Sequence, residues 1–189
     1  MGFLDVILGR TKPTKSKRDN LFAITTAEIT LRNRYFCNHL GKAGISFKPV
    51  ESSFFTNLDD EIRDLLKVSA RSTGTDVSIR EDSYGYKWVI LEDPDFEDLV
   101  SLIYMIGETF ADHGYGPSLL AAVFPFREGS KEFHWIYSFK RGRFYPFVPL
   151  PGNMQRDNSM GLRIRTWMEK ELPIENQLEQ WYGLWGIPF

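Results

Sequence analysis

The chain has 189 residues, of which 42% are hydrophobic and 15% aromatic, and its net charge at pH 7 is −2. A chain of this length and composition can enclose one substantial hydrophobic core, which excludes a wholly disordered protein. Residues 1–20 carry a net charge of +3, so the remainder carries −5. A body of that sign is a poor general partner for nucleic acid, whose phosphates must be neutralised by Lys and Arg.

The compartment is indicated by the cysteine count and by the order of the first residues. One cysteine, Cys37, forbids an internal disulfide and is typical of a reducing compartment. No apolar run approaches the roughly 20 residues that span a bilayer. The basic run follows the first apolar residues instead of preceding them, which is not the order of a signal peptide. We therefore expect a cytoplasmic protein.

Residues 1–19 are predicted to form a short amphipathic helix followed by a basic, flexible linker. Phe3 lies four positions before Ile7, and Leu4 four before Leu8, which is the spacing of a helical stripe. This pattern is consistent with packing on the chain's own domain, or with docking on an anionic membrane or a helical partner. The candidate docking residues are Phe3, Leu4, Ile7, Leu8, Lys12, Lys15, Lys17 and Arg18.

The rest of the chain, residues 20–189, is predicted to form a single domain. Short strands are expected at 27–31 and 45–50, followed by an amphipathic helix that begins at Ser52 or Ser53. The stretches DVSIRE and YGYKWVIL, joined by a turn at DSYG, predict a β-hairpin.

The clearest helix signal follows at EDPDFED. Asp93 is expected to cap this helix, and Pro94 to occupy its first position, where proline is common. The carboxylates that follow are favourable at the positive end of the helix. Gly114 is expected to end it in the left-handed conformation. Its apolar stripe is Phe96, Leu99, Val100, Ile103, Ile106 and Phe110.

Three further strands and a helix complete the predicted fold. SLLAAVFPF is expected to be a central strand, with KEFHWIYSF and FYPFV pairing beside it. A helix is expected from about Asp157 until Pro173 stops it. A helix followed by a hairpin thus occurs twice, which predicts an α+β fold with an antiparallel sheet flanked by helices. This order is similar to the type III secretion chaperone-like fold.

The last hairpin contains FKRGRFYPFVPL, in which aromatic and basic residues alternate closely. With RG at 141–142 as a two-residue turn, Phe139 is expected to pair with Phe144, and Lys140 with Arg143. Like charges placed opposite one another are unfavourable, so an acidic partner is the natural complement of this turn.

The two kinds of side chain in this hairpin are predicted to have different roles. Apolar cross-strand pairs are ordinary sheet contacts, so we expect the aromatic side chains to be mainly buried. The cations are expected to project from an exposed tip. The candidate partner-binding residues are Lys140, Arg141 and Arg143.

No complete set of catalytic or metal-binding residues is apparent in the sequence. His39, His113 and His134 stand outside HExxH and triad contexts, and the CNH at 37–39 does not supply the four ligands of a closed zinc site. The acids of EDPDFED are explained by a helix start and lack the spacing of a calcium loop. We expect no metal and no cofactor, although an enzyme with a dispersed site remains an alternative.

The chain resembles the AB-type phage-shock-protein-A-associated proteins of bacteria and archaea. The matching stretches are spread in order over nearly the whole chain, and their combination is more specific than each alone. They are MGFLDVILGRTKP, YGYKWVI, KRGRFYPFVPLPG, RDN and ELPIENQLEQWYGLWGIP.

This resemblance implies an association with phage-shock protein A homologues and a membrane-bound protease in envelope-stress systems. The family has no established enzymatic activity, so it supplies no catalytic residues. We therefore expect a non-enzymatic accessory protein that acts by protein–protein contact, with weak contact to an anionic membrane and a homodimer as further options. Nucleic acid is not an expected partner.

Overall fold

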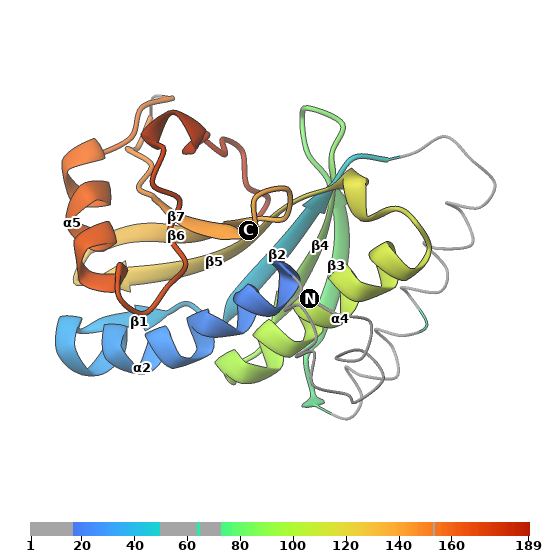
Figure 1. Ribbon diagram of the computed structural model, residues 1–189, viewed down its shortest axis with the longest axis horizontal. Coiled ribbons are helices and arrows are strands. Elements are labelled where there is room, and N and C mark those ends of the chain that lie inside the picture. The colour runs from blue at the N-terminus through green and yellow to red at the C-terminus, as the bar shows by residue number, and fades with distance from the viewer. Residues whose placement is uncertain (1–16, 50–63, 65–72, 153) are drawn as a thin grey trace, which may run out of the picture.

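The computed structural model describes residues 17–49, 64, 73–152 and 154–189 (Figure 1). Within these ranges the chain forms three α-helices, three short 3-10 helices and seven strands. The helices are η1 (Lys17–Phe22), α2 (Ala23–Tyr35), α4 (Phe96–Asp112), η2 (Gly116–Ser118), α5 (Asn158–Met168) and η3 (Leu178–Gln180). The strands are β1 (Cys37–His39), β2 (Lys42–Phe47), β3 (Asp76–Glu81), β4 (Lys87–Glu92), β5 (Leu119–Glu128), β6 (Lys131–Ser138) and β7 (Arg143–Phe147).

The strands form one open sheet in the order β3-β4-β2-β5-β6-β7, and every pairing between them is antiparallel. β1 pairs with β5 beyond the end of β2, so the two short strands share one side of β5. The predicted α+β class with an antiparallel sheet is therefore confirmed. Its likeness to the type III secretion chaperone-like fold stays a prediction.

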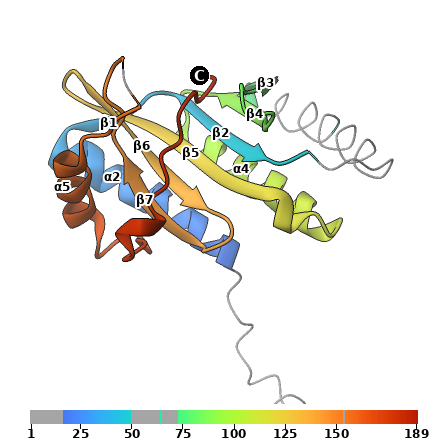
Figure 2. The same cartoon turned by 90° about the horizontal axis from the view of Figure 1, so that it is seen from above.

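Helices α2 and α4 cover one face of the sheet (Figure 2). The ring of Phe110 on α4 lies 4.8 Å from that of Phe47 on β2, and Phe96 lies 5.7 Å from Phe124 on β5. The predicted apolar stripe of α4 is buried throughout. This aromatic and aliphatic layer is part of the hydrophobic core, whose burial is the main favourable contribution to folding.

The opposite face of the sheet is covered by residues 173–189, which we call the C-terminal segment (Figure 2). Gly44 on β2 permits this packing, because a Cβ atom there would lie 2.4 Å from the ring of Phe189. Three ring pairs join the two layers: Tyr145 with Trp181, Phe147 with Trp185, and Trp88 with Phe189.

The strand predicted at residues 27–31 is wrong, because these residues lie inside α2. The β-branched residues of this stretch favoured a strand, but they lower helix propensity only by tenths of a kcal/mol. Ile24, Ala27 and Leu31 recur at helical spacing and are fully buried against the sheet. Tertiary burial thus outweighs local propensity. The strand predicted at 45–50 overlaps β2, which ends at Phe47.

The predicted cap of α4 is also wrong by two positions. Asp95 is the N-cap, and its side chain accepts hydrogen bonds from the backbone N–H groups of Glu97 and Asp98. Asp93 instead accepts from the Asp95 N–H at 2.8 Å and from the Thr75 hydroxyl at 2.5 Å. Asp93 therefore braces the turn that precedes the helix, while Asp95 begins the helix itself.

Two other predicted ends agree with the structure, but α5 ends at Met168, before the predicted stop at Pro173. Gly114, with φ of 80°, follows α4 in the left-handed conformation, and the Asp157 side chain caps α5 by accepting from the Met160 N–H at 2.9 Å. The helix predicted from Ser52 or Ser53 lies outside the described residues. Among those described, no helix is both long and apolar enough to cross a bilayer.

Lys17, Arg18 and Asp19, which precede the predicted boundary at residue 20, already contact the domain. Arg18 forms an ion pair with Glu108 of α4, and Asp19 accepts a hydrogen bond from the Tyr104 hydroxyl at 3.1 Å. Residues 17–19 are thus part of the domain and not of a free linker.

Candidate partner-binding site

The β6–β7 hairpin differs from its predicted register by two residues. Ser138 pairs with Arg143, so the connection is a four-residue loop, residues 139–142, which we call the tip loop. Gly142, with φ of 66°, donates its N–H to the Ser138 carbonyl at 2.7 Å. The predicted pairing of Lys140 with Arg143 is therefore wrong. Because the shift is by two, each strand residue keeps its predicted face of the sheet.

The aromatic residues before the tip loop are in the core, as predicted. Trp135 and Tyr137 are fully buried on the face covered by the helices, and Phe139 is half-buried. The rings of Tyr137 and Phe144 lie 4.8 Å apart across the two strands. These side chains hold the hairpin in place and leave the tip loop as its accessible part.

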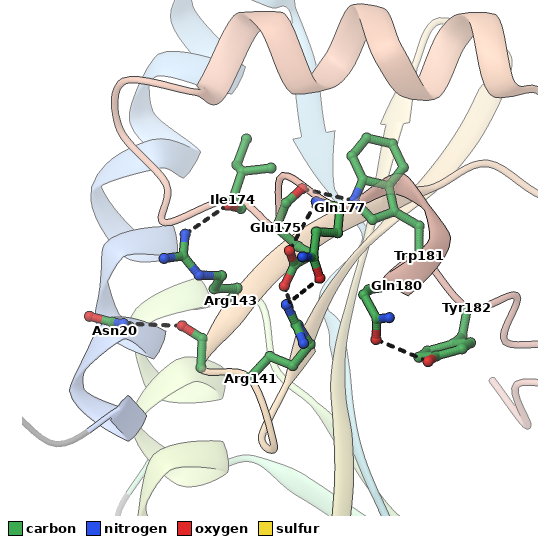
Figure 3. Close-up of polar contacts among 10 residues, drawn as sticks. Asn20, Arg141, Arg143, Ile174, Glu175, Gln177, Gln180, Trp181 and Tyr182 are labelled. Atoms are coloured by element: carbon green, nitrogen blue, oxygen red, sulfur yellow. Dashed lines mark hydrogen bonds and ion pairs between the residues drawn. The ribbon is translucent and has the colours of Figure 1, made fainter.

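Arg141 does not project freely from the tip loop, because it is bound to the C-terminal segment (Figure 3). Its guanidinium forms an ion pair with Glu175 and donates to the Gln177 side-chain oxygen at 3.0 Å. The hydrogen bond from Arg141 lowers the pKa of Glu175. Glu175 also accepts from the Gln177 N–H, at 3.0 Å, so its buried carboxylate has two donors.

Arg143 is tied to the same segment. Its guanidinium donates to the Ile174 carbonyl at 3.1 Å (Figure 3). The backbone of Phe144 bonds on both sides of Ile174, accepting from the Glu175 N–H at 2.8 Å and donating to the Pro173 carbonyl at 3.0 Å. Two of the three predicted partner-binding cations are thus used within the chain to fix the C-terminal segment against β7.

Lys140 is the exposed cation of the tip loop. No ion pair or hydrogen bond is seen for its ammonium group in the part of the chain that the structure describes. It lies on the rim of an open groove of about 680 Å³, which we call the tip groove. The groove is lined by Gly116, Pro117, Leu119, Leu120, Ala121, Ser138, Phe139, Lys140, Tyr145, Tyr182, Gly183 and Leu184.

The tip groove has an apolar wall with few charges. Leu120 on β5 is 37% exposed and Tyr182 is 61% exposed, and Lys140 is the one ionised lining residue among them. A concave apolar surface with one cation at its rim suits an amphipathic segment that carries apolar side chains and a carboxylate.

The start of the described chain lies beside this site. The Tyr137 hydroxyl donates to the Lys17 carbonyl. The Asn20 side chain donates to the Gly142 carbonyl at 3.0 Å (Figure 3). A Cβ atom at Gly142 would lie 2.8 Å from that of Lys17. Of the predicted docking residues, the structure therefore places Lys17 and Arg18 near the tip loop. The other docking residues lie outside the described ranges.

The histidines and the cysteine do not converge on this groove. His134 is 9% exposed on β6, and burial lowers its pKa to about 4. Burial also raises the pKa of the Cys37 thiol to about 11 and lowers the pKa of His39. No group of three metal-ligating side chains is found within the described residues.

Sequence reasoning found the cation on the rim but missed the groove itself. Its walls come from η2, β5, the tip loop and the C-terminal segment, which are far apart in sequence. The one local signal is Leu120, an apolar residue in the stretch predicted to be a central strand. Its exposure depends on the path of the C-terminal segment, which local patterns do not specify.

The sequence matches the family described as PspA associated protein B over residues 1–189. No curated protein and no solved structure matches the chain. Because the family match covers the whole chain, the chain belongs to the PspA associated protein B family.

Proposed function

We propose that this protein is a non-enzymatic accessory protein of a phage-shock system, and that it binds a PspA homologue through the tip groove. The family supports an association with PspA. The observation that carries the proposal is the apolar groove with Lys140 at its rim. The groove lies on a rigid support, because the tip loop is fixed by Arg141 and Arg143 to the C-terminal segment.

The groove indicates the chemistry of the partner surface. Covering Leu120 and Tyr182 removes apolar surface from water, and fully burying one such aliphatic side chain contributes roughly 1.5–3 kcal/mol. A carboxylate of the partner beside Lys140 fixes the orientation of the bound partner and raises its rate of association, an effect that salt weakens. The matching partner element is an amphipathic helix with apolar residues on one side and an acidic residue next to them.

This binding would place the protein in the cytoplasm, held at the inner face of the membrane by its partner. The single cysteine is in keeping with a reducing compartment. The protein then needs no chemistry of its own, since its effect is exerted by occupying a surface of the PspA homologue. A membrane-bound protease and a second copy of this chain are the competing occupants of the groove.

The experiment is a pull-down with the purified PspA homologue of the same host. Leu120→Lys places a charge on the apolar wall, and Lys140→Glu reverses the rim cation. Lys170→Glu is the matched control, because Lys170 is an exposed lysine just beyond α5 and outside the groove.

The proposal predicts that both groove variants lose at least about tenfold in affinity, which corresponds to 1.4 kcal/mol, while the control binds normally. Binding by the unaltered protein should also weaken as salt is raised. Undiminished binding by Leu120→Lys would show that the groove is not the site. Capture of the protease or of a second copy in place of PspA would overturn the assignment of the partner.

A further inference from the structure

The described chain begins between two adjoining grooves. Lys17 lies against Gly142 of the tip loop, and the next residue, Arg18, lines a second groove of about 370 Å³. This second groove shares four lining residues with the tip groove. They are Gly116, Pro117, Leu119 and Phe139. The residues that precede Lys17 are therefore joined to the domain at the edge of the tip groove.

The length of the preceding chain is sufficient to reach this groove. Sixteen residues come before Lys17, and nine positions separate it from Leu8. Nine extended residues span at most roughly 30 Å, which is ample for a groove that begins beside the attachment point. A segment tethered so closely has an effective concentration in the millimolar range at the groove, far above that of a free second copy.

The composition of the segment matches the groove. Residues 3–8, FLDVIL, contain five apolar side chains and one carboxylate, Asp5. The groove offers the exposed side of Leu120 and the ammonium group of Lys140. The segment and the groove are thus complementary: apolar side chains can cover the apolar wall, and the carboxylate of Asp5 can pair with Lys140.

We propose that the tip groove is an intramolecular binding site for residues 3–8 of the same chain, with Asp5 beside Lys140. The inference rests on the proposed function in one respect: the PspA homologue uses the same groove and must displace this segment. The segment then acts as a competitor held in place by the chain. The apparent affinity for the partner then equals the affinity of the open groove multiplied by the fraction of molecules in which the groove is open.

The test is disulfide trapping in the full chain. Val6→Cys with Ser138→Cys places one thiol in the segment and one on the groove wall. Val6→Cys with Ser159→Cys is the matched control, because Ser159 is an exposed serine on α5 outside the groove. The native Cys37 does not interfere, because it is buried and its raised pKa keeps it protonated.

The expected result is an intramolecular disulfide that forms at least about tenfold faster in the Ser138 pair than in the control pair. Leu184→Cys in place of Ser138→Cys gives a second groove position if the first variant folds poorly. Adding Lys140→Asp should slow trapping, and Asp5→Lys together with Lys140→Asp should restore it. Equal rates in the groove and control pairs, or disulfides formed mainly between molecules, would overturn the proposal.

The same proteins separate this inference from the proposed function. If both are correct, the trapped protein does not bind the PspA homologue, and reduction of the disulfide restores binding. A trapped protein that still binds PspA leaves the intramolecular site standing and refutes the groove as the partner site. Absence of trapping together with loss of PspA binding by Leu120→Lys refutes only the intramolecular site.

Discussion

Arg141 in the tip loop forms an ion pair with Glu175, whose side chain is only 4% exposed in the C-terminal segment. This pair joins the tip loop to the C-terminal segment, and both of them line the tip groove. The groove therefore depends on a contact between residues 34 positions apart. Removing the arginine leaves a buried carboxylate with the Gln177 N–H as its remaining described donor.

Arg141→Gln should lower the stability of the protein more than Lys140→Gln, which is expected to stay within about 0.5 kcal/mol of wild type. Because Arg141 lowers the pKa of Glu175, the ion pair stabilises the folded protein above the ordinary carboxyl pKa. This stabilisation is lost as the pH falls and Glu175 becomes protonated. Urea unfolding at neutral and acidic pH measures this. Equal stability of the two variants at neutral pH would contradict the role of the pair.

Reversing the charge of Lys140 and of Arg141 should have different effects on stability. The sequence predicted Lys140, Arg141 and Arg143 at an exposed tip, where reversing a charge costs little stability. The structure predicts that Lys140→Glu is tolerated, whereas Arg141→Glu sets two carboxylates against each other at Glu175. Thermal unfolding of the single variants distinguishes the cases. A single Arg141→Glu variant as stable as Lys140→Glu would show that the observed ion pair is unimportant.

Deletions at the N-terminus should have different effects on either side of Lys17. Removal of residues 1–16 leaves the contacts of Lys17, Arg18 and Asp19 intact and removes only the proposed contacts of residues 3–8 with the tip groove, so it should lower the unfolding temperature less than removal of 1–19. Removal of 1–19 deletes the acceptor of the Tyr137 hydroxyl and the Arg18–Glu108 ion pair, and should lower it clearly. Differential scanning calorimetry makes the comparison. Identical unfolding of the two truncated proteins would show that η1 contributes nothing.

His134 should make the protein less stable at mildly acidic pH. Burial lowers its pKa from 6.5 to about 4, so between these values the unfolded state binds more protons than the folded state. Stability therefore rises with pH through this window and levels off above it. The full shift corresponds to roughly 3 kcal/mol. In urea titrations at pH 7 and 4.5, His134→Gln should lose less stability on acidification than wild type, and an equal loss would refute this assignment.

Phe36 is expected to be a stabilising site for glycine. It follows α2 with φ of 56° and is 77% exposed, so it bears left-handed strain and buries little surface. That conformation costs a non-glycine residue roughly 1–2 kcal/mol, part of which is offset by the greater freedom of an unfolded glycine. Phe36→Gly should gain up to about 1 kcal/mol over Phe36→Ala in urea unfolding. No gain would show that the strain is relieved elsewhere.

The sequence predicted those elements whose signals are local. The apolar stripe of α4, the β3–β4 hairpin and the start of α5 near Asp157 depend on periodicity, turns and end chemistry within a few residues. It failed where distant chain segments decide the outcome. The stretch 27–31 is helical because α2 is buried against the sheet, and the tip loop has four residues while its sequence also suits a two-residue turn.

The candidate site shows the same division. Lys140 was found because a cation at a hairpin turn is a local feature. The roles of Arg141 and Arg143 were not found, because their acceptors come from residues 174–177 at the other end of the domain. The groove arises only when η2, β5 and the C-terminal segment are brought together. Its prediction therefore requires the tertiary fold.

The most direct test of the central claim is to map the PspA-binding surface by NMR. The isotope-labelled full chain is titrated with the unlabelled PspA homologue, and the backbone amide signals are followed. We expect the changes to concentrate at the groove residues, above all Leu120, Lys140, Gly183 and Leu184, and Lys140→Glu to diminish them. Changes that cluster instead on α5 or on the β3 edge, with the groove signals unmoved, would contradict it.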